Sequence, residues 1–287
     1  MKRESRYIVP TDIVYSSAHF ICIVKRLVRE YPFIKYFVIG KSLMGTDLVG
    51  LSIGAGRKQI FYSGAFHGNE WLTTPVLLRF LEEYAYHYRM GRDFYGIDAV
   101  KLFKEYTLFV VPMVNPDGVD FAGCYPQWKA NGRGVDLNLQ FPAGWEQAKK
   151  NKEEAGIILP GPRDFPGNAP LTEPESRAIY DFTIEHDFRL ILAYHSQGRE
   201  IYWKYLDYEP ANSRAIAEYF HRVSGYTVSE TPAFSAYAGY KDWFIMEYNR
   251  PGYTIEAGLG ENPLPVSQFS GIYKDNIGIM LGGMLNV

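Results

Sequence analysis

The 287-residue sequence predicts a single α/β domain. Short apolar runs with strand character alternate with segments whose apolar residues recur at helical spacing, which is the pattern of an α/β protein. No linker-like, repeated or low-complexity stretch interrupts that alternation, and a hydrophobic content of 47% is enough to fill one sizeable core. These observations favour one domain, over 1–287, and not two.

The first third of the chain predicts a helix, a hairpin and a strand that leads into a second helix. Apolar residues at helical spacing indicate a helix over 13–31, and two strand-like runs over 35–40 and 47–53 surround a glycine-containing turn. A third strand is expected over 59–66, and a long helix over 73–88.

The middle of the chain combines one more strand with a long irregular segment. Residues 109–114 form an apolar run that ends in a turn-like sequence over 115–118. Residues 115–170 are rich in Gly, Pro and Asn but also in aromatic residues, so we expect a functional loop and not a disordered one. The other elements expected are helices over 172–185, 212–224, 240–248 and 267–285 and strands over 190–194 and 252–256.

Charge and cysteine content limit the partners and the compartment. The chain has 30 basic and 32 acidic residues without a dense basic run, which argues against nucleic acid as a partner. Its two cysteines, Cys22 and Cys124, are far apart and indicate a reduced compartment. The N-terminus lacks the apolar core of a signal peptide and no apolar stretch is long enough to cross a membrane, so we expect a soluble, cytoplasmic protein without a membrane partner.

Three apolar strands end in polar residues of a catalytic type: His67, His195 and Glu256. In open α/β sheets, sites form beyond the carboxyl ends of the strands. Glu70 lies three residues after His67, where a first helical turn brings both side chains to one face. Taken singly, His67 and Glu70 also fit a solvated helix face, and His195 also fits a hydrogen-bonded core histidine. Their convergence is what predicts a metal site.

Two histidines and one carboxylate, with a fourth position left for water, form the ligand set of catalytic zinc. Zinc lowers the pKa of a bound water to about 7 and polarises a carbonyl, so a nearby carboxylate can carry the remaining proton. We therefore expect one Zn²⁺ per chain on His67, Glu70 and His195, with Glu256 as the general base.

These residues lie within longer motifs that resemble the zinc metallocarboxypeptidase family from about residue 10 to the C-terminus. The closer resemblance is to its branch of bacterial γ-D-glutamyl-meso-diaminopimelate peptidases of the endopeptidase I type. The motifs are His67-x-x-Glu70, Trp128-Lys129-Ala130-Asn131, Gly134-Val135-Asp136-Leu137-Asn138, Gln140-Phe141-Pro142-Ala143-Gly144-Trp145, Gly161-Pro162-Arg163-Asp164, the run from His195 to Trp203, Ala238-Gly239-Tyr240-Lys241-Asp242-Trp243 and Thr254-Ile255-Glu256.

The resemblance implies a three-layer α/β/α sandwich around a mixed, mainly parallel eight-stranded sheet. It also implies that Asp136 hydrogen-bonds a ligand histidine, which fixes the histidine's tautomer and basicity. Lys129 lies where the family has a transition-state arginine, and its charge suits the stabilisation of an oxyanion.

The departures from the family concern substrate binding. Asn69 replaces a frequent arginine beside the ligand Glu70. Leu139 follows Asn138 where the family usually has a carboxylate-binding arginine, and a leucine cannot make that pair. Ordinary release of one C-terminal residue is therefore not expected. The substrate-binding residues expected instead are Asn138, Arg199, Arg163 and, as the family's mobile tyrosine, Tyr237 or Tyr240.

The predicted function is hydrolysis of the γ-D-glutamyl-meso-diaminopimelate bond in peptidoglycan-derived peptides by metal-activated water. The expected chain is one catalytic domain without cell-wall-binding repeats, which favours a role in wall-peptide recycling or sporulation; its oligomeric state stays open. One alternative is a zinc carboxypeptidase or amidohydrolase acting on other acyl-amino acids. Another is a non-catalytic muropeptide-binding module, against which Glu256 argues because a binder needs no general base.

Overall fold

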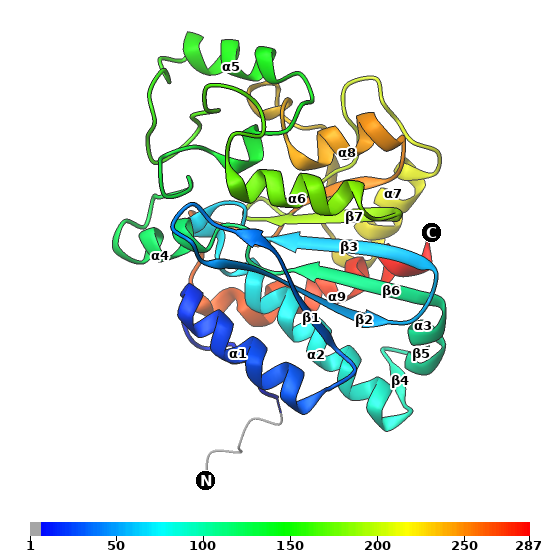
Figure 1. Ribbon diagram of the computed structural model, residues 1–287. Helices are drawn as coiled ribbons and strands as arrows, with labels where there is room; N and C mark the ends of the chain where they lie inside the picture. Colours follow the sequence, from blue (N-terminus) through cyan, green and yellow to red (C-terminus); the bar gives the residue numbers. More distant parts are fainter. Residues whose placement is uncertain (1–6) are drawn as a thin grey trace.

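A mixed sheet of eight strands forms the centre of the molecule (Figure 1). The structure is a computed structural model that describes residues 7–287 of the chain. The strand order is β1-β2-β6-β3-β7-β10-β8-β9. The bounds are β1 Lys35–Lys41, β2 Asp47–Gly54, β3 Lys58–Gly64, β6 Tyr106–Val111, β7 Phe188–His195, β8 Glu200–Tyr202, β9 Thr227–Ser229 and β10 Gly252–Glu256. The predicted hairpin over 35–53 is confirmed, since β1 and β2 pair antiparallel.

The four central strands β6, β3, β7 and β10 all run parallel. In β3 the residues from Ile60 onward are buried, and in β7 only Arg189 is exposed, as expected of strands covered on both faces. Register places Ser63 beside Ala193, and Glu256 beside His195. The carboxyl ends of β3, β7 and β10 therefore lie next to one another at one edge of the sheet.

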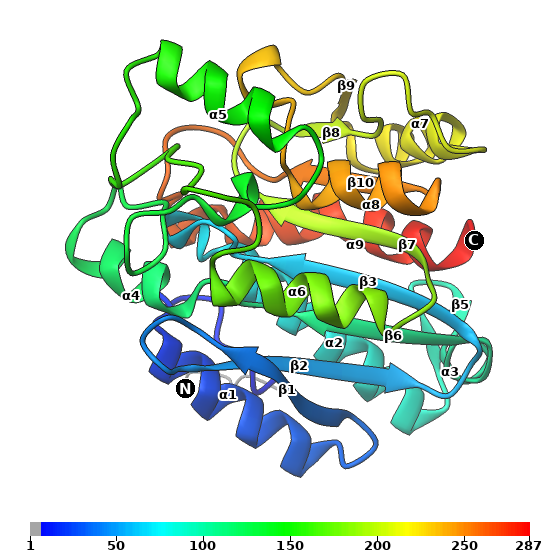
Figure 2. The same ribbon diagram turned by 45° about the horizontal axis from the view of Figure 1, so that its top comes forward.

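Helices cover both faces of the sheet, which confirms the three-layer sandwich (Figures 1 and 2). One hydrophobic core lies between the sheet and α1, α2, α3, α7 and α9, and a second lies between the sheet and α6 and α8. The bounds on the first face are α1 Ser17–Glu30, α2 Thr73–Met90, α3 Ala99–Glu105, α7 Ser213–Ser224 and α9 Phe269–Leu285. Those on the second are α6 Pro174–Ile184 and α8 Tyr240–Tyr248.

The segment over 115–170 is less irregular than predicted, because it contains the helices α4 (Pro116–Cys124) and α5 (Trp145–Glu154). The turn expected over 115–118 is the start of α4: the Asn115 side chain caps the helix by accepting from Gly118 N–H, and Pro116 occupies its first turn. Asn and Pro favour a helix start as much as a turn. Composition could not distinguish the two.

Several short elements were not predicted. They are α3, β8, β9 and a two-stranded hairpin of β4 (Asp93–Phe94) and β5 (Ile97–Asp98). Strands of two or three residues are too short to show an apolar period, so only their pairing partners reveal them.

None of the helices in the described part of the chain has the length and apolarity needed to cross a membrane.

Candidate active site

The segment between β3 and α2 presents the first two predicted metal ligands. His67 is extended, and Gly68–Glu70 form a 3₁₀ turn, whereas the sequence suggested the first turn of the α-helix itself. Gly68 is required here, because a Cβ atom would lie 2.1 Å from the carbonyl oxygen of Gly118 in α4. The close approach of α4 thus holds the turn that carries Glu70.

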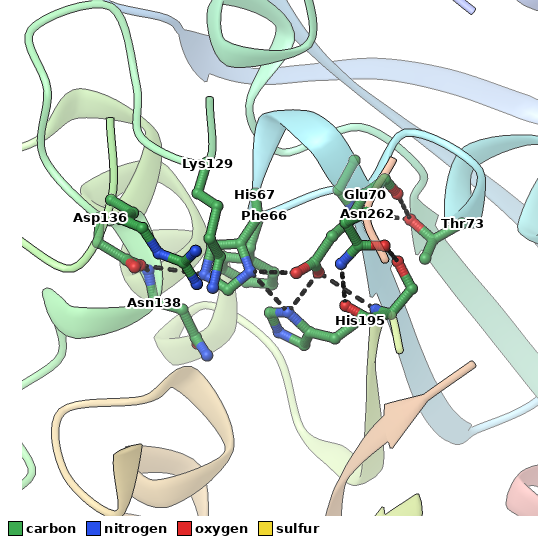
Figure 3. A network of polar contacts seen from close by, with 12 residues as sticks. Phe66, His67, Glu70, Thr73, Lys129, Asp136, Asn138, His195 and Asn262 are labelled. Atoms are coloured by element: carbon green, nitrogen blue, oxygen red, sulfur yellow. Dashed lines mark hydrogen bonds and ion pairs between the residues drawn. The ribbon is translucent and has the colours of Figure 1, made fainter. Parts of the chain in front are cut away.

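The three predicted metal ligands converge on one point, as Figure 3 shows. His67 Nδ1 lies 2.8 Å from Glu70 Oε1, and His195 Nδ1 lies 2.9 Å from Glu70 Oε2. The two Nδ1 atoms are 3.2 Å apart. The residues His67, Glu70 and His195 are only 6%, 3% and 1% exposed, so solvent screens their charges little.

Asp136 contacts the other side of His67. Its Oδ1 lies 3.1 Å from His67 Nε2, and the same oxygen accepts from Asn138 N–H at the start of the 3₁₀ turn Leu137–Leu139. A proton on Nε2 that is donated to Asp136 leaves the Nδ1 lone pair of a neutral His67 directed at Glu70. We propose that Asp136 positions His67 through this contact.

The buried carboxylates of Glu70 and Asp136 require a compensating positive charge nearby. Burial lowers the pKa of His67, but the carboxylates of Glu70 and Asp136 outweigh this effect and raise the pKa to about 9. Burial also raises the pKa of Glu70, yet the two histidines hold it well below its usual range. Burial lowers the pKa of His195 despite Glu70 and keeps that imidazole neutral. A metal-free site therefore holds an extra proton on His67, and a bound cation would replace it.

The residues fit zinc. Four tetrahedral ligands at about 2.0–2.1 Å from zinc lie about 3.3 Å from one another, and the two Nδ1 atoms have nearly this separation. Two imidazole nitrogens and one carboxylate also match the usual ligand chemistry of catalytic zinc. Among the described residues, this is the one cluster of histidine and acidic side chains close enough to hold a metal ion.

Glu256 is the last residue of β10 and lies beside His195 in the register of the sheet. Desolvation raises its pKa, and the negative charge of Glu70 adds to the effect, so that the pKa of Glu256 reaches about 8 although Lys129 and His67 lower it. A carboxyl group with a pKa near neutrality can both accept and donate a proton at pH 7.

Lys129 lies on a loop fixed by backbone contacts. Its carbonyl accepts from Gly68 N–H at 2.9 Å, and its own N–H donates to the Pro162 carbonyl at 2.8 Å. Burial lowers the pKa of Lys129, but Asp136, Glu70 and other nearby carboxylates outweigh it, so the net shift raises the pKa and the side chain is a cation.

A cavity of about 580 Å³ connects these groups. Of the residues predicted for the site, those that line it are His67, Glu70, Lys129, Asn138, Arg163, His195 and Glu256. The Arg163 guanidinium pairs through Nε with Asp164, and no described residue pairs with its two terminal nitrogens. Asn138 uses its Oδ1 to accept from Tyr240 N–H, which leaves its amide nitrogen available to a ligand.

Two of the predicted substrate contacts, Arg199 and Tyr240, do not belong to the residues that line the cavity. Arg199 does not line the cavity: its guanidinium forms an ion pair with Asp275 at 3.3 Å, donates to the Ser224 carbonyl and lies over the Tyr226 ring. Tyr240 is 0% exposed, because its hydroxyl pairs with Thr183 and its ring packs within the core beneath α8. Both residues serve packing or charge pairing.

Tyr237 is half-buried and packs edge-on against Tyr205, with the ring centroids 6.4 Å apart. Its neighbours Ser235 and Gly239 line the cavity, but Tyr237 does not. Its role as the family's mobile tyrosine stays a prediction.

Sequence reasoning missed several polar residues of the cavity wall as possible substrate contacts, among them Asn69, Lys241 and Tyr202. Asn69 lines the cavity and its buried Oδ1 has no hydrogen-bond partner in the described residues. Lys241 also lines it, but its ammonium group already contacts Asp242 at 2.6 Å and the Lys204 carbonyl at 2.6 Å. Tyr202 lines the cavity from the short strand β8, whose three residues are too few to show an apolar period in the sequence.

Comparisons with known proteins agree with this geometry. A family model described as zinc carboxypeptidase, peptidase M14, matches residues 22–278. Gamma-D-glutamyl-L-diamino acid endopeptidase 1 of Lysinibacillus sphaericus is 42% identical over 282 residues, which cover 91% of this chain and 70% of that protein.

Solved structures share the fold at low sequence identity. The crystal structure of thrombin activatable fibrinolysis inhibitor superposes with a TM-score of 0.81 at 19% identity and covers 99% of this chain and 76% of that chain. Carboxypeptidase A from Helicoverpa armigera gives a TM-score of 0.76 at 22% identity, over 98% of this chain and 76% of that chain. Together with the family match and the 42% identical relative, they establish that the chain belongs to the zinc carboxypeptidase family and is a zinc metallopeptidase.

Proposed function

We propose that this enzyme hydrolyses the γ-D-glutamyl bond to meso-diaminopimelate, or to a related L-diamino acid, in peptides derived from peptidoglycan. The observation that carries the proposal is the complete His67, Glu70, His195 and Glu256 constellation in a chain 42% identical to an enzyme named for γ-D-glutamyl-L-diamino acid cleavage. One zinc ion per chain follows from the one ligand cluster found in the described residues.

The residues divide the chemistry between proton transfer and charge stabilisation. When bound at the three ligands, zinc would supply a Lewis acid for the scissile carbonyl, an activated water and a charge that favours ionised Glu256. Glu256 takes a proton from the attacking water and passes it to the nitrogen of the leaving amino acid. Lys129 places its ammonium in the same cavity, where it stabilises negative charge that develops on the carbonyl oxygen.

Substrate orientation rests on other residues that line the cavity. Leu139 is buried and apolar, so it binds no carboxylate. Arg163 binds the substrate carboxylate instead, because its terminal nitrogens have no partner among the described residues and a planar guanidinium can donate two parallel hydrogen bonds to a carboxylate. The amide nitrogen of Asn138 and the unpaired Oδ1 of Asn69 add one donor and one acceptor for the peptide.

Metal analysis combined with peptide hydrolysis tests the proposal. Purified enzyme is assayed on L-Ala-γ-D-Glu-meso-diaminopimelate and on the isomer with an α-linked L-Glu, before chelation, after chelation and after zinc return. We expect one zinc per chain, cleavage of the γ-linked peptide only, loss of activity on chelation and recovery with zinc. Equal rates on both isomers would instead indicate a general acyl-amino acid hydrolase, and tight peptide binding without cleavage would indicate a binding module.

A further inference from the structure

Strand β8, which pairs with the strand of Glu256, carries a second carboxylate, Glu200, that the mechanism does not use. Strands β8 and β10 pair antiparallel, with Glu200 opposite Glu256 and Tyr202 opposite Thr254. Residues directly opposite in an antiparallel pair point to the same face of a sheet. Glu200 and Tyr202 therefore lie on the face of the sheet that bears Glu256, and Tyr202 itself lines the cavity.

The two side chains are joined by a short hydrogen bond in which the Tyr202 hydroxyl donates to Glu200 Oε2. A carboxylate can only accept, so the phenol proton is committed to Glu200. Burial raises the pKa of Tyr202 strongly, and the bond to Glu200 adds to this, so the phenol keeps its proton. The Tyr202 oxygen then offers the cavity lone pairs and no donor.

The charges around the pair favour a cationic ligand. Glu200 has no ion-pair partner among the described residues, and Glu256 is its neighbour across the strands. Lys129 and Arg163 also line the cavity, but they lie on two loop segments that backbone hydrogen bonds join to each other. Lys241 is engaged by Asp242 and the Lys204 carbonyl. An acceptor-only hydroxyl beside an unpaired carboxylate is suited to an ammonium group.

We infer that the Tyr202 hydroxyl, held and polarised by Glu200, binds the second ammonium group of the diamino acid that leaves the scissile bond. The inference rests on the proposed function, because only a leaving group with a second amine has such a cation to offer. It assigns to β8 the selection of diamino over monoamino substrates, and separates that selection from the carboxylate binding assigned to Arg163.

A positioning role toward Glu256 is the competing explanation, and the two differ in what they change. Removing an ammonium contact raises KM for diamino substrates alone. Disturbing Glu256 lowers kcat for every substrate, since each one needs the same proton transfer.

The experiment compares L-Ala-γ-D-Glu-meso-diaminopimelate with the matched peptide that ends in 2-aminopimelate, which keeps the distal carboxylate but lacks the second amine. The zinc-loaded wild-type enzyme, Tyr202→Phe and Glu200→Gln are assayed on both peptides. Tyr208→Phe is the matched control, since Tyr208 is exposed and does not line the cavity.

We expect wild-type kcat/KM to be higher for the diaminopimelate peptide by roughly ten-fold or more, the usual range for a hydrogen bond to a charged group. Tyr202→Phe should lose that preference through KM and leave the aminopimelate peptide unchanged, Glu200→Gln should lose the same preference, and Tyr208→Phe should match the wild type. Equal losses on both peptides, or no wild-type preference, would overturn the inference while leaving the proposed function intact. Cleavage of neither peptide by the wild type would refute the proposed function itself.

Discussion

The two walls of the active-site cavity are built in different ways. His195 and Glu256 end neighbouring parallel strands, and His67 follows the next strand by three residues, so the register of the sheet determines their spacing. Lys129, Asn138 and Arg163 lie on loops between α4 and α6, and no strand register places them. The metal-ligating histidines and the general base thus lie at or just beyond the ends of central strands, and we call this side of the cavity the strand wall. Lys129 and the proposed substrate contacts Asn138 and Arg163 lie in connecting segments, which we call the loop wall; such segments vary more readily than the strands that they connect.

The loop wall depends on buried side chains that bridge distant segments. Asn115 donates to the Phe66 and Ala130 carbonyls, which ties the loop of Lys129 to the end of β3. Asn131 donates to Glu173 at the start of α6, at 2.6 Å. Because these contacts join residues far apart in the chain, the position of the loop wall is a tertiary property.

The largest effect should follow from a change on the strand wall. Glu256→Gln keeps the size of the side chain but removes proton transfer, so we expect kcat to fall by roughly 10²- to 10⁴-fold. Zinc content should not change, because Glu256 is not among the three converging ligands. Kinetics with the γ-linked peptide and elemental analysis measure the two quantities. Hydrolysis at the wild-type rate would contradict the proposed role of Glu256.

A smaller and different effect should follow from a change on the loop wall. Arg163→Ala removes the proposed carboxylate contact and should raise KM by roughly ten-fold or more, with a lesser change in kcat. Arg199→Ala is the matched control, because Arg199 pairs with Asp275 outside the cavity. Its KM should stay within two-fold of wild type, roughly the scatter expected when a solvent-exposed ion pair is lost. A larger KM effect at Arg199 than at Arg163 would reverse the assignment.

A third effect concerns stability and not catalysis, and it reports the desolvation of the strand wall. The pKa of Glu256 is raised from 4.5 to about 8 in the folded, metal-free protein. Folding therefore favours the protonated carboxyl: this contribution to stability is fully present below about pH 4.5 and is lost as the pH rises through about 8. Metal-free Glu256→Gln, which cannot ionise, should gain stability over metal-free wild type between pH 5 and 9.

Chemical denaturation of both metal-free proteins across that pH range measures the difference in the free energy of unfolding. Glu154→Gln, at the exposed end of α5, is the control and should follow the wild-type pH dependence. A constant difference between Glu256→Gln and wild type at all pH values would show that the Glu256 carboxyl is solvated like an ordinary surface group.

The metal site could be predicted from local features alone. An apolar strand that ends in His67, His195 or Glu256 is visible in the sequence, and parallel strands bring such ends together without further information. The same reasoning located the hairpin of β1 and β2 and the buried strand β7. Periodicity and the residue that ends a strand are short-range signals, and the parallel pairing of β3, β7 and β10 converts them into proximity.

The substrate wall could not be predicted in the same way. Whether Arg199 or Arg163 faces the cavity depends on Asp275 and Asp164, partners that the linear sequence does not identify. Tyr240 entered the core because α8 packs against the second face of the sheet, and β8 became visible only through its pairing with β10. Local patterns therefore determine which groups can do the chemistry, while long-range packing decides which side chains meet the substrate, since burial and charge pairing are settled only between segments that the fold brings together.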